Sequence, residues 1–163
     1  MRGRRKGIQM LRKKVRNEFF ALSMAAFMGC GIFSGSVLAD GYTDAEIEYY
    51  ADLLAHLIAG EVEGCDREMK EATASVPVNR VASAAFPNSL EEVIYQPGQY
   101  ACTWDGNFEK TPTEEDYEIA RDILLNGSKL PENVVYQAEF TQGSGIYKSL
   151  VAPNGVTMYF CYE

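Results

Sequence analysis

The chain has 163 residues, room for one domain of ordinary size. Residues 1–39 hold eight of its 15 basic residues and one of its 23 acidic residues, so residues 40–163 hold seven basic and 22 acidic residues, a net charge of −15. A body this acidic does not bind nucleic acid by neutralising phosphates, and it repels anionic polymers unless its cleft is locally neutral or basic. We therefore expect the direct ligand to be an uncharged sugar.

The first 39 residues have the layout of an export signal. Basic residues precede FFALSMAAFMGCGIFSGSVLA, residues 19–39, in which no side chain is charged. Small residues at Val37 and Ala39 favour cleavage before Asp40. At about 20 residues, the apolar run is also long enough to remain as an uncleaved anchor. We predict a signal peptide or N-terminal membrane anchor over 1–39, contact with the membrane only through residues 19–39, and an exported domain over 40–163.

The first helix of the exported part is predicted to begin near Thr43. Thr43 and Glu46 match a capping box, in which each side chain binds the other residue's backbone N–H. Apolar residues then recur at helical spacing, at Ile47, Tyr50, Leu54, Leu57, Ile58 and Val62. The helix is expected to end at Gly64.

Three more helices follow in the predicted order. One covers about 67–83, with a kink or break at Pro77, and a short one follows Ser89 and stops before Pro97. After a loop over 97–111, Thr111 is expected to cap a helix that ends at Asn126-Gly127.

The remainder of the chain is rich in β-forming residues. Residues 134–136 and 157–162 read as strands, and glycines and prolines between them mark turns. Four helices followed by a small antiparallel sheet make an α+β domain.

His56 is the only histidine in the sequence, which limits the possible chemistry. A zinc hydrolase usually needs two or three histidine ligands, so we expect no metal and no cofactor. Cys–His and Ser–His–Asp catalysis would both depend on His56. Because His56 lies near the apolar stripe of its helix, we interpret it as a partly buried structural residue.

Glu61 is the candidate acid/base. It follows Leu57-Ile58-Ala59-Gly60 near a helix C-terminus, a setting that disfavours an ionised carboxyl group. A carboxyl group that keeps its proton can protonate a glycosidic oxygen. A solvated surface glutamate is the competing interpretation. Glu63 is turned about 200° away along the helix and is expected at the surface. Nothing singles out a second carboxylate among Asp66, Glu68, Asp105 and Glu139.

The exported part has three cysteines, Cys65, Cys102 and Cys161. An odd number allows at most one internal disulfide. A Cys65–Cys102 bond and three unpaired thiols both stay open, because sequence does not test the geometry.

Four motifs carry a family resemblance: LAHLIAGEVEG (54–64), VPVNRVAS (76–83), FPNSLEEVIYQPGQY (86–100) and TEEDYEIARDIL (113–124). They resemble the SleB-type cell-wall hydrolases, the spore-cortex-lytic enzyme family. The string FPN-x4-VIYQPGQ[FY] is long and specific, and the 18-residue step from Glu61 to Asn79 fits the family pattern. The resemblance covers residues 53–162, nearly all of the exported part.

The resemblance implies a lysozyme-like fold related to lytic transglycosylases, with 40–163 as the catalytic domain and Glu61 as the catalytic residue. The implied substrate is the peptidoglycan glycan strand, cut between N-acetylmuramic acid and N-acetylglucosamine. Glu61 would protonate the leaving oxygen and then take a proton from the muramic C6 hydroxyl, which closes on C1 to leave a 1,6-anhydro end. Neither a metal nor a second carboxylate is needed.

Sugar contacts are predicted at four residues with amide or aromatic side chains: Gln99, Tyr100, Tyr136 and Gln137. For the two tyrosines, core packing stays open. Arg80 is expected to meet the muramic carboxylate or to pair with a surface acid, and Asn79 to hold a loop.

This sequence departs from the family pattern at Gly60, Cys65, Pro77 and Thr157. These departures leave two alternatives open: a hydrolytic muramidase, in which water attacks instead of the C6 hydroxyl, and a catalytically silent wall-binding domain. The choice between vegetative wall and spore cortex is open as well, as are the oligomeric state and any partner protein.

Overall fold

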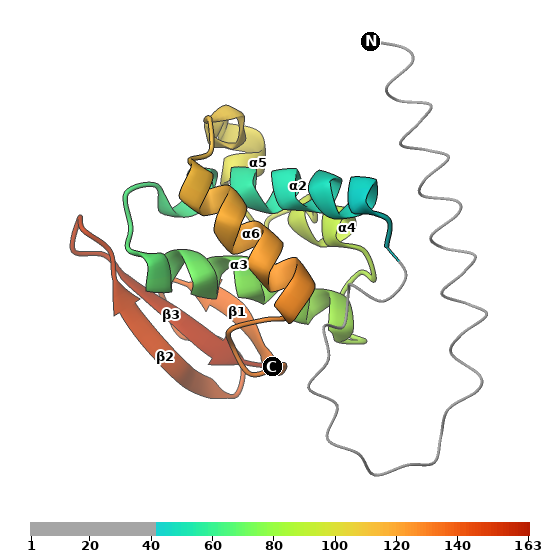
Figure 1. The fold of residues 1–163 in the computed structure, drawn as a ribbon. Helices are drawn as coiled ribbons and strands as arrows, with labels where there is room; N and C mark the ends of the chain where they lie inside the picture. The colour runs from blue at the N-terminus through green and yellow to red at the C-terminus, as the bar shows by residue number, and fades with distance from the viewer. Residues whose placement is uncertain (1–41) are drawn as a thin grey trace, which may run out of the picture. The chain divides into compact units, whose positions relative to one another are not determined.

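The computed structural model describes residues 42–163, which form an α+β domain (Figure 1), so the predicted fold class is confirmed. The elements are α2 (Asp44–Val62), α3 (Arg67–Ala82), α4 (Leu90–Ile94), α5 (Cys102–Asp105), the 3-10 helix η1 (Asn107–Glu109), α6 (Glu114–Asn126), β1 (Val134–Ala138), β2 (Gly145–Val151) and β3 (Thr157–Tyr162). The predicted export signal and the cleavage position lie outside the described residues. Within 42–163, no helix is both long and apolar enough to cross a membrane.

Helix α2 begins at the capping box expected from the sequence. The backbone N–H of Thr43 donates to Glu46 Oε2 at 2.8 Å, and the N–H of Glu46 donates to Thr43 Oγ1 at 3.4 Å. The last residue of the helix is Val62, and Gly64 follows with a φ of 74°, a left-handed conformation that glycine adopts without strain. The buried face of α2 therefore runs up to the residues beside Glu61.

Helix α3 is the central helix of the domain. It contacts α2, α4, α6 and β1, and eleven of its 16 residues are buried. The helix runs from Arg67 to Ala82 through Pro77, so the break that was one predicted outcome does not occur. Packing on several sides offsets the one backbone hydrogen bond that a proline removes. Because α3 is enclosed, its polar residues must find hydrogen-bond partners inside the protein.

Two details of the predicted helices were wrong. The stretch 97–111, predicted as a loop, contains α5 and η1. Helix α6 is capped by Thr113 rather than Thr111. Thr111 and Thr113 each have an acidic residue three positions further on. In the structure the capping box forms at Thr113, because Asp116 Oδ2 accepts the N–H of Thr113 at 2.8 Å.

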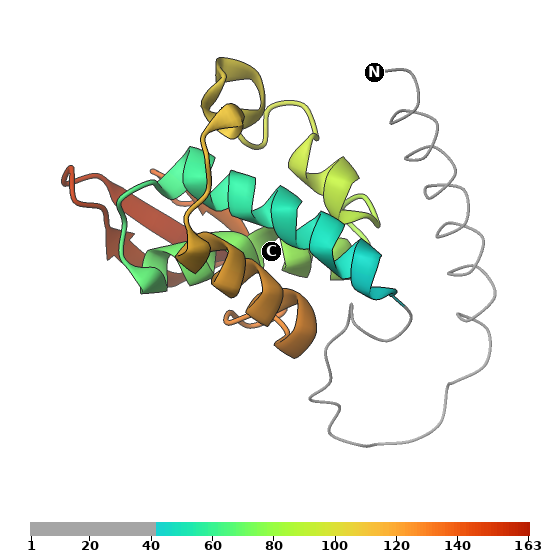
Figure 2. The same cartoon turned by 45° about the horizontal axis from the view of Figure 1, so that its top comes forward.

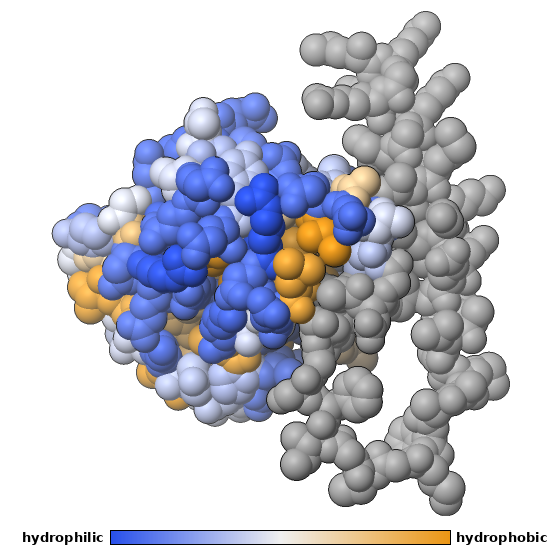
Figure 3. Space-filling view, viewed as in Figure 1, coloured by the Kyte–Doolittle hydropathy of each residue, from blue (hydrophilic) through white to orange (hydrophobic). Residues whose placement is uncertain are grey.

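The sheet has three antiparallel strands in the order β1-β3-β2. β2 was missed as a strand because most of its residues are exposed and it lies at the edge of the sheet. Helix α3 packs on β1, while α5 and η1 lie on the other side of α2 from α3 (Figure 2). In the space-filling view, hydrophilic side chains cover most of the face that α6 presents. Hydrophobic ones show between the start of α2 and the end of α6, and again towards the β2–β3 hairpin (Figure 3).

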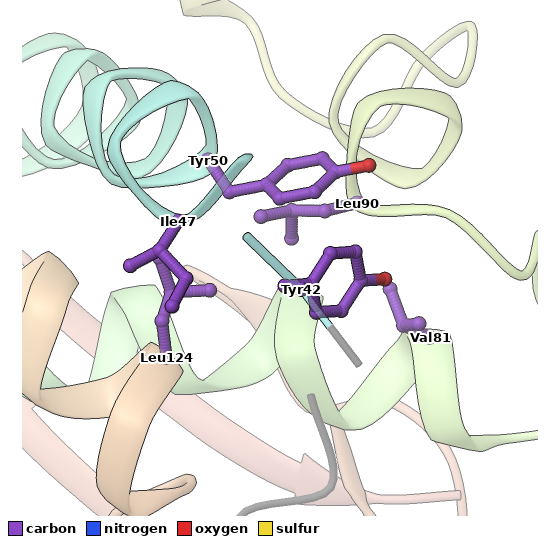
Figure 4. Close-up of a pocket in the computed structure, with 6 residues that line it drawn as sticks. All are labelled: Tyr42, Ile47, Tyr50, Val81, Leu90 and Leu124. Carbon is purple, nitrogen blue, oxygen red and sulfur yellow. The ribbon is translucent and has the colours of Figure 1, made fainter. Parts of the chain in front are cut away.

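A small apolar hollow lies between the start of α2 and helices α3, α4 and α6 (Figure 4). It is lined by Tyr42, Ile47, Tyr50, Val81, Leu90 and Leu124. The rings of Tyr42 and Tyr50 meet edge to face with their centroids 5.4 Å apart. Among the described residues, the only ionisable groups that line this hollow are the hydroxyls of Tyr42 and Tyr50, and burial raises the pKa of both.

Candidate active site

Glu61 lies in the last turn of α2, where its side chain is partly buried. Its Oε1 atom accepts a hydrogen bond from the backbone N–H of Cys102, at 3.1 Å. Cys102 is the first residue of α5 and is 2% exposed. A carboxyl group from one helix is thus tied to the backbone of a segment 41 residues further along the chain.

The close approach of α5 to α2 depends on Gly60. A Cβ atom on Gly60 would lie 2.7 Å from Cys102 Cβ, 3.1 Å from Cys102 Sγ and 3.3 Å from the carbonyl oxygen of Asn107. Such distances are shorter than van der Waals contact, so a larger residue would push α5 away from the end of α2. Gly60, one of the departures from the family pattern, therefore lets Cys102 reach Glu61.

An open cleft of about 670 Å³, a volume that includes space open to solvent, begins at Glu61. We call it the Glu61 cleft. One wall is the end of α2 and the turn to Cys65, and the other is formed by the β2–β3 turn and by Glu139, which follows β1. Apolar side chains dominate the lining, with Val62, Met69, Ala152, Pro153, Val156 and Met158 beside the polar Asn154 and three glutamates. Apolar surface with a few polar groups suits the face of a sugar ring.

The other acidic residues near the cleft have different environments. Glu63 forms an ion pair with Lys110 at 2.8 Å and its side chain is 68% exposed, which confirms the surface position predicted for it. Asp66 caps α3, Asp105 accepts the N–H of Asn107, and Glu68 pairs with Lys148. Glu139 is exposed, lines the Glu61 cleft and forms no ion pair within the described residues. Among the four open candidates for a second carboxylate, Glu139 is the one in the cleft.

The four predicted sugar-contact residues are not among those that line the Glu61 cleft. Gln99 is exposed in the loop after α4, and Tyr136 is partly buried with its ring edge-on to Phe86. Gln137 is partly buried, and its Oε1 atom has no hydrogen-bond partner among residues 42–163. Tyr100 is 3% exposed, and burial raises the pKa of its hydroxyl, which likewise has no partner in that part of the chain, to about 12. Sugar contact at these positions stays a prediction.

Arg80 is buried, at 3% exposure, rather than at the surface. Its Nε donates to the carbonyl of Val135 at 2.6 Å, and its guanidinium lies over the rings of Phe86 and Tyr100, 5.0 and 5.4 Å from their centroids. Within the described part of the chain it forms no ion pair, so the surface acid expected as one alternative is not found. Among residues 42–163, its buried Nη1 atom has no hydrogen-bond partner.

Asn79 has the structural role predicted for it. Its Nδ2 donates to the carbonyls of Pro131 and Val134, at 2.8 and 2.9 Å, and so holds the turn into β1. His56 also has a structural environment: its Nδ1 lies 2.8 Å from the carbonyl of Phe108, whose ring stacks on the imidazole.

Cys65, Cys102 and Cys161 are free thiols, so the disulfide left open by the sequence is not present. Sequence reasoning missed two features of the site: the contact of Cys102 with Glu61, and the β2–β3 turn as a cleft wall. One signal for the first was available, because Gly60 is unusual inside a helix and indicates close approach of another segment.

Enzymes that cleave glycans use carboxyl groups beside the scissile bond, and the open cleft of this domain presents Glu61 and Glu139. The model of the cell wall hydrolase family matches residues 64–151, about half of the chain. The chain belongs to the cell wall hydrolase family. The matched segment begins three residues after Glu61, so the match carries no information on that residue.

The chain is similar to the spore cortex-lytic enzyme of Bacillus cereus, with 32% identity over 102 residues. That alignment covers 63% of this chain and 38% of the relative, so the chain spans well under half of the relative's length. The solved catalytic domain of the Bacillus cereus SleB protein is 27% identical, with a TM-score of 0.54, over 81% of this chain and 99% of that one. The catalytic domain of a germination-specific lytic transglycosylase, SleB from Bacillus anthracis, shares the fold, at 23% identity and a TM-score of 0.52, over 74% of this chain and 98% of that one.

Proposed function

We propose that this chain cleaves the glycan strands of peptidoglycan between N-acetylmuramic acid and N-acetylglucosamine as a lytic transglycosylase, with Glu61 as its single acid/base. The observation that carries the proposal is the position of Glu61, whose carboxyl group is held by the backbone N–H of Cys102 and lies at the end of an open cleft of about 670 Å³. Family membership supports the substrate class, because the related Bacillus cereus protein is a spore cortex-lytic enzyme.

In the proposed mechanism Glu61 first acts as an acid and gives its proton to the oxygen of the glycosidic bond, which breaks as that oxygen leaves C1. The resulting carboxylate then takes the proton of the muramic C6 hydroxyl while the C6 oxygen bonds to C1. The product ends in a 1,6-anhydro ring, and Glu61 is protonated again for the next cycle. The apolar lining of the cleft favours a ring face over bulk water, which would otherwise compete for C1.

The second candidate is a hydrolytic muramidase, and Glu139 is the observation that favours it. Hydrolysis needs a second carboxylate to activate water or to stabilise the sugar cation. Glu139 lines the same cleft as Glu61. Water would then attack C1, and the product would have a reducing end.

The experiment is mass spectrometry of the soluble fragments that residues 40–163 release from purified vegetative wall and from spore cortex. Four proteins are compared: the wild type, Glu61→Gln, Glu139→Gln and Glu68→Gln. Glu68→Gln removes the same charge at an exposed ion pair with Lys148, outside the cleft lining, and is the matched control. We expect anhydro-ended fragments from the wild type and Glu68→Gln, and none from Glu61→Gln.

Other results would assign a different function to the chain. Reducing-end fragments that disappear with Glu139→Gln would move the function to a muramidase. No release from any folded variant on either substrate would favour the silent wall-binding domain. Because peptidoglycan lies outside the cytoplasmic membrane, the proposed activity requires export, for which residues 1–39 stay the predicted signal.

A further inference from the structure

Asn154 lies in the β2–β3 turn, which forms one wall of the Glu61 cleft. Its Oδ1 atom accepts the backbone N–H of Val156 at 3.0 Å. Because only the amide oxygen can accept from an N–H group, this bond also fixes which way the amide points. The side chain is exposed, and no residue among 42–163 accepts a hydrogen bond from its Nδ2 atom. Asn154 therefore presents an oriented donor that is free to bind a ligand.

The backbone of this turn is held at several points. The N–H of Ala152 donates to the carbonyl of Val156, and the N–H of Gly155 donates to the carbonyl of Ala152, both at 2.8 Å. Pro153 has a fixed φ, and Gly155 has a φ of 86°, which suits glycine. The backbone that carries Asn154 therefore has little freedom left to lose when a ligand binds.

The other polar side chains of the cleft are mainly acceptors. Glu61, Glu63 and Glu139 line it, and an ionised carboxylate only accepts hydrogen bonds. Apart from the proton of Glu61 and the weak S–H donor of Cys65, Asn154 supplies the only side-chain donor among the described residues that line the cleft. Sugar hydroxyl groups can donate to the glutamates, whereas a carbonyl oxygen can only accept. A ligand carbonyl in this cleft therefore depends on Asn154.

We propose that Asn154 determines specificity for N-acetylated sugars by donating a hydrogen bond from Nδ2 to the carbonyl oxygen of an acetamido group. The inference rests on the proposed function, in which both sugars of the glycan strand carry such a group. Ala152, Pro153 and Met158 line the cleft on either side of Asn154 in the sequence, so apolar surface is available for the acetyl methyl group. A sugar without its acetyl group has an ammonium at that position, which donates and cannot accept from Nδ2.

The test measures the binding of two kinds of glycan strand, native and chemically de-N-acetylated. All variants carry Glu61→Gln, so that no strand is cut. Asn154→Ala removes both the donor and the bond to Val156, whereas Asn154→Asp removes the donor and keeps an oxygen for Val156. Asn133→Asp is the matched control, because it makes the same chemical change at an exposed turn residue outside the cleft lining.

Both Asn154 variants should bind native strands about 10-fold more weakly than Glu61→Gln alone, the effect of one lost hydrogen bond, and Asn133→Asp should not. Asn154→Ala should bind de-N-acetylated strands as tightly as Glu61→Gln alone, because these strands accept nothing from Nδ2. Each comparison is made on one kind of strand. The general attraction between an ammonium-bearing strand and an acidic domain therefore cancels.

Two results would overturn the role of Asn154. Equal weakening of both strands by Asn154→Ala would show that the acetyl group is not recognised. Full binding of native strands by Asn154→Asp would show that only the shape of the turn matters. The proposed function would survive either result if the chain with Glu61 intact still releases anhydro-ended fragments.

The opposite combination separates the two proposals in the other direction. Acetyl-dependent binding through Asn154, in a chain that releases no fragments with Glu61 intact, would refute the proposed function and keep Asn154 as part of a wall-binding site. If Glu61→Gln alone binds neither kind of strand, the cleft takes no glycan, and both proposals are wrong.

Discussion

Replacing Gly60 by alanine tests whether the short distance between α2 and α5 exists in solution. At an open position in a helix, Gly→Ala stabilises by about 1 kcal/mol, because glycine has the greater backbone freedom to lose. Here the added Cβ would lie 2.7 Å from Cys102 Cβ and 3.3 Å from the carbonyl oxygen of Asn107. Overpacking of this kind typically costs about 1–3 kcal/mol. The net effect expected for Gly60→Ala is a destabilisation of about 1 kcal/mol.

The assay is urea unfolding of residues 40–163, monitored by circular dichroism. Glycan release is measured separately on the same protein preparations without urea. The added Cβ should push α5 outward, and α5 carries the N–H that binds Glu61. We therefore expect the rate of glycan release to fall even where the domain stays folded. Adding Cys102→Ala to Gly60→Ala removes the contact with Sγ and leaves the shorter one with Cβ, so the double variant should keep most of the strain. If Gly60→Ala alone raises stability by about 1 kcal/mol, the close packing of α2 on α5 is wrong.

Three further predictions concern the core, the thiols and the alkaline limit of stability. Asn79→Leu should lower the free energy of unfolding, measured in urea, by about 2–4 kcal/mol, because the carbonyls of Pro131 and Val134 lose their donor. A loss below about 1 kcal/mol would contradict the role of Asn79 in holding the turn into β1. Burial raises the pKa of the thiols of Cys65 and Cys102, so their alkylation should be slow at neutral pH and faster as pH rises. Peptide mapping should show that the more exposed Cys65 is modified first, and earlier modification of Cys102 would refute its burial. Burial by itself lowers the pKa of Lys70, but hydrogen bonds to Glu115 and Asp116 outweigh it and raise that pKa above 10.5. The stabilisation that charged Lys70 contributes is therefore present below pH 10.5 and lost as pH rises through the higher pKa of the folded state. The free energy of unfolding should thus fall less steeply at alkaline pH in Lys70→Met than in the wild type.

The helices were predictable where the signal is local. The Thr43–Glu46 capping box and the apolar spacing behind it determine the start and the buried face of α2 without reference to the rest of the chain. The cap of α6 was placed two residues early because Thr111 and Thr113 both flank Pro112. Each has an acid three residues further on, Glu114 or Asp116, so the sequence fits both caps, and the structure forms the one between Thr113 and Asp116.

Features that depend on contacts between distant segments were harder to predict from the sequence. β2 is an edge strand with mostly exposed residues, and its apolar residues stand in adjacent pairs, Ile146-Tyr147 and Leu150-Val151, instead of alternating with polar ones, so the strand pattern is not visible in the sequence. Arg80 reads as a surface cation from its charge. Its burial follows from an acceptor on β1 and from two rings that the sequence places elsewhere. The position of Glu61 near an apolar helix end was predictable, whereas its partner Cys102 comes from a segment that only the fold brings close.

The order of the strands in the sheet has a consequence for when the molecule becomes active. β3 is the last strand in sequence but lies between β1 and β2, which do not pair with each other. Neither outer strand can complete its ladder until residues 157–162 are available to both. The β2–β3 turn, one wall of the Glu61 cleft, is therefore among the last parts to form as the chain emerges. A chain in which residues 157–162 have not yet paired would have its helices and Glu61 but only one wall of the Glu61 cleft, so under the proposed function it could not yet hold a glycan strand.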